Sequence, residues 1–460
     1  MIVCGRERTK VRAEAADKEG TGNMQVTIKP VKLSGKIDAI SSKSYLHRIL
    51  LCAAMSDRST VIRLNCRSKD VDATIRCIRA MGAKVEVKED CLVVWPVEAN
   101  TGLGVEVGEL PLLDCGESGS TARFVLPMTA AVCGGGTLVG EGRLPERPFG
   151  AICTVMEENG CTFSSYQLPM TVTGPLAAGT YRIPANISSQ YISALMMSLP
   201  LIEGDSEIVF TTEVESEGYL DITEAVMKEF GVTLEPTGNG YKIKGNRRYQ
   251  SPGEITAEGD WSNGAFWVAA NALGCDLQIG NLKTDSLQRD RQIVSVAERL
   301  FQGIERQEMD GVPEAALADG ETDSVEPPEI VINGADIPDI IPISAVMACG
   351  KTGRTRFINC GRLRLKESDR LETVKTLICA LGGQAIVDKD DLIVDGCGQL
   401  KGGTIDSFKD HRIVMSAAIA ATICTEPVTI TNAQDVAKSY PEFFADYKRL
   451  SKDNKMEYCK

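Results

Sequence analysis

The sequence predicts an α/β protein built from six copies of one helix–helix–hairpin unit. Apolar residues recur at i, i+3 and i+4 in two helical segments of every unit. The first helix of each unit begins roughly 70 to 80 residues after the previous one, which indicates a repeated supersecondary unit. Each second helix ends near a glycine, and most continue into alternating strand-like segments. The alternative interpretation is a generic α/β protein with unrelated helix–hairpin units.

Three units are predicted in the first part of the chain. The first has helices at 44–55 and 70–83 and a hairpin over 83–94. The second has helices at 119–132 and 148–160, followed by a strand segment at 161–174. The third has helices at 188–201 and 219–231, followed by a segment with strand character at 232–245.

Three further units are predicted in the second part. The fourth unit has helices expected at 261–274 and 290–303. The fifth has helices at 337–350 and 368–383 and a hairpin over 384–396, and the sixth has helices at 410–422 and 441–450. Two stretches depart from the pattern. Residues 1–23 are mixed, charged and small, and we expect a disordered leader there. The acidic segment 303–328, rich in Gly, Pro and Ala, is expected to be an exposed loop inserted in the fourth hairpin.

Composition excludes several classes of protein. The net charge of −13 argues against nonspecific nucleic-acid binding, although a local cluster of cations can still bind phosphate. The 16 cysteines are scattered without a CxxC pair and there are only two histidines, so a zinc site or a disulfide framework is not expected. Most cysteines are interpreted as small buried residues. No apolar run reaches the length of about 18 residues that crosses a membrane. The N-terminus lacks an apolar signal core, so a cytoplasmic protein is expected.

The starts of the first helices suggest an anion site. They carry small, hydroxyl or charged residues, which suit helix N-caps. If several of these N-termini face one cleft, their dipoles favour anionic ligands. The residues are Ser44, Gly119 with Ser120, Ser188 with Ser189, Ser262, Asp339 and Asp410.

Five cations come from different units: Lys43, Arg147, Arg370, Arg412 and Lys438. Two phosphates and one carboxylate would need roughly that number, with Arg favoured for bidentate contacts. Each motif alone has a simpler interpretation. The segment at 41–48, with Lys43 and Ser44 before the first helix and Arg48 about one turn in, also fits a solvated basic helix start.

Other polar groups around the helix starts suggest binding and acid–base chemistry. Gly119 lies in a turn where backbone N–H groups can approach a phosphate, and Ser188, Ser189 and Gln190 exceed what one cap needs. Asp339 also fits a plain N-cap. With Glu367, Lys366 and Lys43, it would supply acid–base groups.

The motifs and their order resemble the 5-enolpyruvylshikimate-3-phosphate synthase family, from about residue 24 to about residue 450. The match comprises Lys43–Ser44 with Arg48, CGxSGST at 115–121, ERP at 146–148, SSQ at 188–190, Ser216 with Tyr219, GDxS at 259–262, IPD at 337–339, KESDR at 366–370, DHR at 410–412 and KSYP at 438–441. The resemblance implies a two-lobed inside-out α/β barrel with three units per lobe, helices inside and sheets outside. By resemblance, residues 43–257 form the second lobe, and residues 24–42 plus 258–460 form a discontinuous first lobe.

The resemblance also implies substrates and roles. Phosphoenolpyruvate and shikimate 3-phosphate would bind between the lobes of a monomer that needs no cofactor, metal, nucleic acid or membrane. Asp339 would be the base on the 5-hydroxyl, Glu367 the proton donor to the methylene carbon, and Lys43 a further catalytic group. The residues for shikimate 3-phosphate would be Lys43, Ser44, Arg48, Ser188, Ser189, Gln190, Ser216, Tyr219, Asp339 and Lys366; those for phosphoenolpyruvate would be Lys43, Gly119, Arg147, Gln190, Arg370, Arg412 and Lys438.

The chain departs from the family pattern at three places. Glu117 and Arg362 stand where the family often has Asn, and GDWSN replaces the commoner GDxSS. An acid at 117 would repel an anion unless it points away. Gly119 carries no side chain, so the resemblance implies inhibition by glyphosate in competition with phosphoenolpyruvate.

Two alternative functions stand beside the one that the resemblance implies. One is the sister enzyme acting on UDP-N-acetylglucosamine, whose family typically has a reactive cysteine near an Arg–Pro sequence; the segment GEGRLPERPFG at 140–150 has none. The other is a phosphometabolite sensor without catalysis, which need not keep the acid–base set of Asp339, Glu367 and Lys366.

Overall fold

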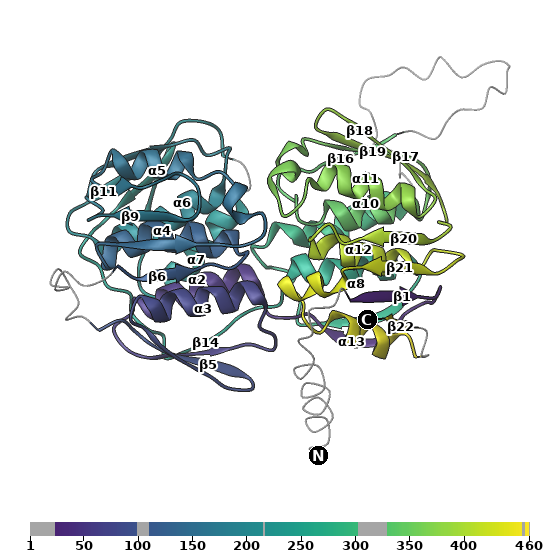
Figure 1. Cartoon of the computed structure of the whole chain (residues 1–460), viewed down its shortest axis with the longest axis horizontal. Helices are drawn as coiled ribbons and strands as arrows, with labels where there is room; N and C mark the ends of the chain where they lie inside the picture. The colour runs from purple at the N-terminus through teal and green to yellow at the C-terminus, as the bar shows by residue number, and fades with distance from the viewer. Residues whose placement is uncertain (1–23, 99–109, 215–216, 302–328, 453–455, 460) are drawn as a thin grey trace, which may run out of the picture.

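A computed structural model describes residues 24–98, 110–214, 217–301, 329–452 and 456–459. The predicted leader at 1–23, most of the predicted inserted loop at 303–328 and the candidate residue Ser216 lie outside these described residues. The chain forms two bodies that stand side by side in Figure 1. Each body has its own apolar core, one formed by side chains between Leu46 and Ala257, the other by side chains between Val26 and Ile40 and between Trp261 and Met456, with Cys66 added.

The first helix of each unit lies deep in its body, because its side chains are apolar or small almost all round. In the fifth unit every side chain from Ile341 to Cys349 is buried. These helices start 70 to 80 residues apart, as the sequence predicts. They are α2 (Lys43–Ala54), α4 (Gly119–Val132), α6 (Ser189–Ser198), α8 (Trp261–Ala272), α10 (Ile341–Cys349) and α12 (His411–Ala420).

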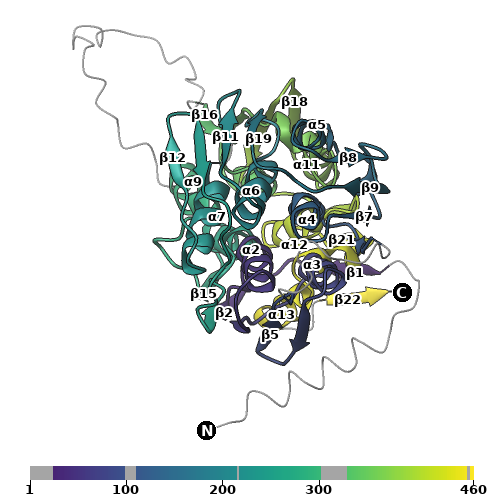
Figure 2. The same cartoon turned by 90° about the vertical axis from the view of Figure 1, so that its left-hand side faces the viewer.

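The second helix of each unit is more amphipathic than the first. All six occur where the sequence predicts them. They are α3 (Lys69–Ala80), α5 (Gly150–Glu157), α7 (Gly218–Glu229), α9 (Ile293–Phe301), α11 (Arg370–Ala380) and α13 (Phe443–Leu450). In the end-on view of Figure 2, α2, α4 and α6 lie toward the middle, and strands such as β5, β9 and β12 lie at the periphery.

Five of the described sheets have four strands. Their orders are β14-β3-β5-β4 (254–256, 60–63, 91–95, 84–87), β6-β7-β9-β8 (112–114, 135–139, 170–173, 162–163), β10-β11-β13-β12 (180–183, 206–210, 240–243, 235–237), β16-β17-β19-β18 (330–333, 352–358, 391–397, 384–388) and β20-β21-β1-β22 (403–406, 428–431, 25–28, 456–459). The hairpin predicted over 83–94 is present as β4 and β5, with Val85 opposite Val94. Each sheet also has one parallel pair that the sequence did not predict.

The two bodies exchange a strand at their junction. In four units the parallel pair joins the strands on either side of the first helix, such as β6 and β7 around α4. Strand β2 (34–38), before α2, instead pairs with β15 (276–280), after α8, and β14, before α8, pairs with β3, after α2. The chain therefore crosses twice between the bodies, and the crossing segments are linked by a bridge between Ser41 and Gly259.

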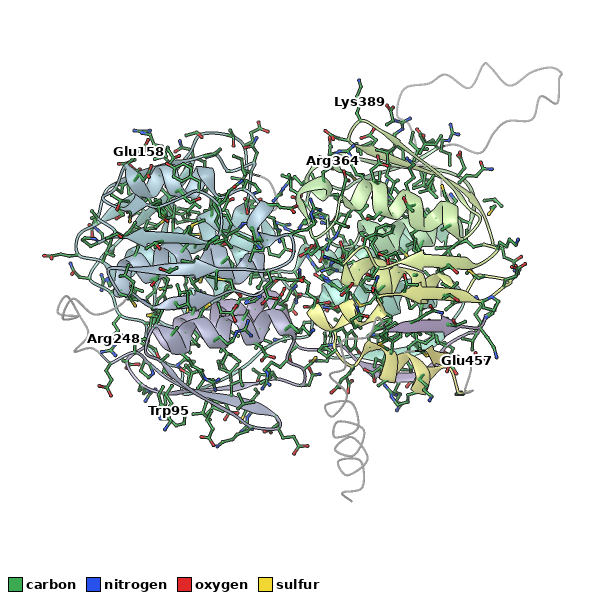
Figure 3. All side chains as sticks on the ribbon, in the orientation of Figure 1. Trp95, Glu158, Arg248, Arg364, Lys389 and Glu457 are labelled. Carbon is green, nitrogen blue, oxygen red and sulfur yellow. The ribbon has the colours of Figure 1, made fainter. Side chains whose placement is uncertain are left out.

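Charged side chains cover the outer surface, as Figure 3 shows for Glu158 and Lys389. The side chains of fourteen of the 16 cysteines are described; all are free thiols, and most are buried, as expected. Among the described residues, no helix is long and apolar enough to span a membrane. No group of three or more His, Cys, Asp or Glu in the same residues is arranged to hold a metal ion.

Candidate active site

A polar cleft lies between the two bodies. Its open space, including the part that merges with solvent, is about 1090 Å³. It is lined by almost all of the candidate residues: Lys43, Ser44, Arg48, Gly119, Arg147, Ser188, Ser189, Gln190, Tyr219, Asp339, Lys366, Glu367, Arg370 and Arg412. Lys438 lines a small adjoining cavity together with Arg147 and Glu367. The cleft thus brings together residues that are up to 369 positions apart in the sequence, Lys43 and Arg412.

The first helices of the units direct their N-termini at this cleft, but the capping residues differ from those predicted. Ser188 and Asp410 cap α6 and α12 as expected, accepting bonds from Gln190 N and Arg412 N. Ser118 caps α4 and Asp260 caps α8, so the predictions for Ser120 and Ser262 are wrong. Helix α2 starts at Lys43, which places Lys43 and Ser44 in its first turn rather than before it. The caps of α4 and α8 both lie two residues earlier than predicted, and Ser120 and Ser262 line the cleft instead.

Asp339 is surrounded by cations and one phenol. Its Oδ1 lies 2.7 Å from Arg370 Nη1, 3.3 Å from Lys366 Nζ and 3.5 Å from Arg412 Nε. Tyr219 donates a hydrogen bond of 2.9 Å to its Oδ2. Burial acts to raise the pKa of Asp339, but the three cations outweigh it and hold this pKa well below its usual range.

The plain N-cap interpretation of Asp339 is wrong. The N-cap of α10 is Ile340, and no side chain caps that helix. The Asp339 carboxylate therefore lines the cleft and does not cap the helix.

Arg370 is the centre of a buried ionic network. Its side chain is 1% exposed and binds three carboxylates, with Nε 2.8 Å from Asp410 Oδ2 and Nη2 2.7 Å from Glu367 Oε2, besides the contact with Asp339. Burial acts to raise the pKa of Glu367, but Arg370, Lys438 and Arg147 hold it well below its usual range. The Glu367 carboxyl is therefore ionised while these cations surround it.

Lys43 has a buried partner that the sequence did not single out. Its Nζ lies 2.9 Å from Asp70 Oδ2, and the two side chains are only 18% and 7% exposed. Its backbone N–H donates to Asp260 Oδ2 at 3.0 Å. The solvated basic helix start is therefore the wrong interpretation of this segment. Asp70 could have been noticed as an acid in the first turn of α3, but nothing local assigns it to Lys43.

Gly119 lies against a pair of arginines. A Cβ at this position would lie 2.5 Å from Arg147 Nη1 and 3.3 Å from Arg123 Nη1. Arg123 donates to Gln190 Oε1, and Gln190 Nε2 donates to Ser120 Oγ at 2.7 Å. Burial and then the charge of Arg147 lower the pKa of Arg123 to about 10. Two neighbouring guanidinium groups favour an anion at this wall of the cleft.

Arg123 was missed as a site residue although it ends the segment GESGSTAR. Its Nε and that of Arg147 are buried without a hydrogen-bond partner in the part of the chain that the structure describes. The signal available in the sequence was its position one turn into α4, which places it on the same side as Gly119.

Arg48 is buried, and its hydrogen bonds go to protein groups. It donates to Thr223 Oγ1 at 2.7 Å, to Ser193 Oγ at 3.2 Å and to the carbonyl oxygens of Ser44 and Tyr219. Its guanidinium also lies 4.9 Å from the ring centroid of Phe124. Arg48 therefore joins α2 to α6 and α7 and fixes the backbone beside the Tyr219 phenol.

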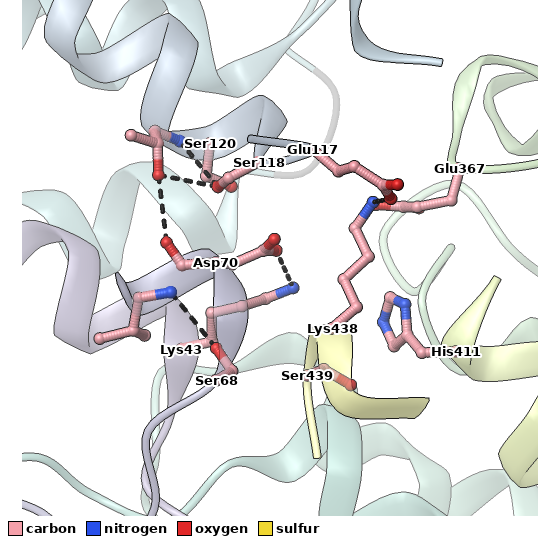
Figure 4. Close-up of polar contacts among 12 residues, drawn as sticks. Lys43, Ser68, Asp70, Glu117, Ser118, Ser120, Glu367, His411, Lys438 and Ser439 are labelled. Atoms are coloured by element: carbon pink, nitrogen blue, oxygen red, sulfur yellow. Dashed lines mark hydrogen bonds and ion pairs between the residues drawn. The ribbon is translucent and has the colours of Figure 1, made fainter. Parts of the chain in front are cut away.

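Figure 4 shows the rim of the cleft around Lys438. Lys438 Nζ lies 3.2 Å from Glu117 Oε2, so the acid at 117 points at a cation and not into the cleft. Burial acts to lower the pKa of Lys438, but Glu367, Asp70 and Glu117 raise it. His411 lines the cleft, and burial followed by the charges of Lys43 and Arg412 holds its pKa well below its usual range. The imidazole is therefore neutral.

Fold and cleft together define a class of protein: an enzyme with a cleft between two bodies, lined by Arg and Lys side chains that favour an anionic ligand. A family model described as EPSP synthase (3-phosphoshikimate 1-carboxyvinyltransferase) matches residues 28–447. The chain belongs to this EPSP synthase family.

Relatives in the family cover nearly the whole chain. The 3-phosphoshikimate 1-carboxyvinyltransferase of Clostridium beijerinckii is 38% identical over 436 residues, 93% of this chain and 97% of that protein. The protein of the same name from Clostridioides difficile is 38% identical over 433 residues, 92% of this chain and 96% of that protein. An EPSP synthase structure from Acinetobacter baumannii has a TM-score of 0.73 at 22% identity and covers 95% of this chain and all of that chain, which supports the mixed α/β fold.

Proposed function

We propose that this enzyme transfers the enolpyruvyl group of phosphoenolpyruvate to the 5-hydroxyl of shikimate 3-phosphate and releases phosphate. The observation that carries the proposal is the ionised Asp339 in a cleft with Lys366, Arg370 and Arg412. A carboxylate held ionised by cations can accept a hydroxyl proton, while the cations attract anionic substrates. The family relatives carry this activity in their name.

The polar wall of the body at 43–257 is assigned to shikimate 3-phosphate. Ser188 and Ser189 at the start of α6 would meet its phosphate, because hydroxyls and N–H groups at a helix N-terminus suit an anion. Tyr219 and Lys366 would hold the ring hydroxyls from opposite sides of the cleft, where both contact Asp339. Arg48 and Ser44 lie beside Tyr219 and support this wall.

Phosphoenolpyruvate is assigned to the neighbouring cations. Lys43, Arg147, Arg370, Arg412 and Lys438 line the cleft or its adjoining cavity, with Gln190 and the bare backbone of Gly119 beside them. Arg123 is a further candidate for this wall, because its guanidinium lies beside Arg147. Side chains larger than glycine at 119 would fill the space next to these arginines.

The reaction balances with protons alone. A proton added to the methylene carbon of phosphoenolpyruvate develops positive charge at C2, and the 5-hydroxyl oxygen attacks C2 while Asp339 takes its proton. The tetrahedral product then loses a methyl proton and phosphate, which restores the double bond. Arg147 and Lys438 would stabilise the leaving phosphate. Glu367 is the proposed donor to the methylene carbon; an anionic substrate that draws Arg370, Arg147 and Lys438 away would raise the pKa of Glu367 and let it carry a proton.

The architecture fits closure of two lobes over the substrates. We propose that the two bodies are the lobes of an inside-out barrel with three units each, 43–257 forming one lobe and 24–42 with 258–460 the other. Contacts such as Tyr219 with Asp339 and Arg143 Nη1 with the Glu367 carbonyl oxygen span the two bodies. Closure would exclude water and assemble the site. A monomer that works in the cytoplasm is the simplest form of this proposal.

The test is phosphate release from the two substrates. We expect release only when phosphoenolpyruvate and shikimate 3-phosphate are both present, and a loss of about 100- to 10,000-fold in kcat for Asp339→Asn. Asp336→Asn is the control, because Asp336 is exposed and lies three residues before Asp339. Release with UDP-N-acetylglucosamine instead would assign the chain to the sister reaction. Release with neither acceptor would overturn the proposal.

A further inference from the structure

The ion pair of Glu117 and Lys438 joins the two bodies at the rim of the cleft. Glu117 stands in the turn before α4, and Lys438 ends η6 (Ala433–Lys438), 321 positions later. In Figure 4 the Lys438 ammonium points at the Glu117 carboxylate, with Glu367 beside it. Lys438 is one of the cations assigned above to phosphoenolpyruvate, so a protein carboxylate contacts a group that the substrate needs.

The position of the Glu117 carboxylate is built into the neighbouring loop. A Cβ on Gly142 would lie 2.8 Å from Glu117 Cδ and Oε1, so a glycine at 142 leaves the room that the carboxylate fills. Gly142 also has φ of +57°, a backbone conformation that favours glycine. Glu117 therefore has a defined place next to Lys438.

The two partners differ in their freedom to move. The side chain of Lys438 is 10% exposed, whereas that of Glu117 is 42% exposed. A half-exposed carboxylate can turn into solvent at small cost, because water replaces its hydrogen bonds. The buried ammonium cannot leave without losing Glu367 and Asp70, whose charges also act on it. When an anion enters, Glu117 is the member of the pair that yields.

The adjoining cavity explains how an anion meets this pair. Arg143, Arg147, Lys409 and Lys438 line it, opposed by Glu117 and Glu367. Arg147 lines both this cavity and the main cleft. An anion held by Arg147 therefore lies within reach of Lys438, and the Glu117 carboxylate repels it while the ion pair persists.

We propose that the Glu117 carboxylate competes with phosphoenolpyruvate for Lys438 and thereby weakens the binding of phosphoenolpyruvate. This inference rests on the proposed function, because it takes Lys438 as a substrate contact. Glu117 takes no part in bond making, so it acts on the KM for phosphoenolpyruvate and leaves kcat and the KM for shikimate 3-phosphate nearly unchanged.

The test is the variant Glu117→Gln, which keeps the size of the side chain and removes its charge. We expect the KM for phosphoenolpyruvate to fall by about three- to tenfold, as for loss of one competing ion pair. The matched control is Glu141→Gln, which removes the same charge from the neighbouring loop that contains Gly142. Glu141 is exposed and lines neither the cleft nor the adjoining cavity, so the KM values of this variant should stay within about twofold of wild type.

A double variant separates competition from other effects. In a Lys438→Met background, Glu117→Gln should no longer lower the KM for phosphoenolpyruvate, because the contested cation is gone. An unchanged KM in Glu117→Gln overturns the inference. A raised KM overturns it too, and would mean that the pair helps to hold the two bodies together.

A direct binding measurement keeps this inference separate from the proposed function. Phosphate release by the wild type with both substrates tests the proposed function alone. Calorimetric titration with phosphoenolpyruvate in the presence of shikimate 3-phosphate, for an Asp339→Asn protein with and without Glu117→Gln, tests the competition without turnover. Tighter binding in the protein with Gln at 117 is expected, and equal binding would overturn the inference even if the wild type is fully active.

Discussion

Tyr219 donates a 2.9 Å hydrogen bond to Asp339, and the two residues belong to different bodies of the molecule. Tyr219 packs against the core of the body at 43–257, whereas Asp339 lies in the turn before α10 of the other body. The bond therefore couples the position of the proposed base to the contact between the two bodies. It holds the oxygen of Asp339 that does not contact Arg370.

Removal of this bond is expected to weaken use of shikimate 3-phosphate. In Tyr219→Phe we expect kcat/KM for shikimate 3-phosphate to fall about tenfold, the order for one hydrogen bond to a charged group. The KM for phosphoenolpyruvate should change less than about twofold. Tyr241→Phe is the control, because the Tyr241 hydroxyl donates to Glu224 within one body. Steady-state kinetics that show equal losses in both variants would contradict a specific role for Tyr219.

Gly119→Ala is expected to act on the phosphoenolpyruvate wall alone. The new methyl group meets the flexible end of Arg147 at 2.5 Å, so the guanidinium must shift while the fold is kept. We expect the KM for phosphoenolpyruvate to rise about tenfold, a cost of about 1.4 kcal/mol. Glyphosate, which should compete with phosphoenolpyruvate in the wild type, should inhibit this variant less. Gly150→Ala is the control, since a Cβ there meets only Tyr166 at 3.9 Å; equal KM values in the two variants would argue against this wall.

Arg370 is expected to contribute to stability as well as to binding. Arg370→Met would leave Asp410, Glu367 and Asp339 without a buried cation and should lower the free energy of unfolding by about 3–5 kcal/mol. Arg354→Met removes an exposed pair with Asp395, in which Arg354 is 50% exposed, and should cost less than about 1 kcal/mol. Urea denaturation of both variants checks this. A loss below about 1 kcal/mol in Arg370→Met would show that the network adds little to folding.

The activity should decline in mild alkali. Burial lowers the pKa of Lys366 to about 8, although Asp339 opposes the shift. Above about pH 8 the amine becomes neutral, so kcat/KM for shikimate 3-phosphate should fall up to tenfold per pH unit. Lys366→Arg should lack this decline, because a guanidinium stays protonated. A pH–rate profile with the same decline in both proteins would contradict the assignment.

Unfolding does not account for such a decline. The unfolded lysine has a pKa of about 10.4, so the unfolded state binds more protons between about pH 8 and 10.4 and stability rises with pH in that window. The buried ammonium of Lys366 costs stability below about pH 8, and that cost disappears as pH increases. Thermal unfolding at pH 7.5 and 9.5 would separate this contribution from the kinetic one.

The repeated unit and the motifs could be predicted because both are local. Helical periodicity, glycine at helix ends and short hairpins depend on residues close in sequence, so α2 to α13 and the β4–β5 hairpin occur where expected. The site motifs are likewise short segments of the sequence, and nearly all of the candidate residues in them line one cleft. The predictions of N-cap residues were less reliable, because several polar residues stand at one helix start. One of them caps the helix and others line the cleft.

Only the tertiary structure decided how the distant parts pair. Three kinds of pairing could not be predicted from the local sequences. They are the pairing of β2 with β15 and of β14 with β3, the ion pair of Asp70 with Lys43, and the ion pair of Glu117 with Lys438. The sequence by itself determined the units, the family and the chemical groups available. Which carboxylate meets which cation depends on distances set by packing across two separate cores, and a charge acts through space rather than along the chain.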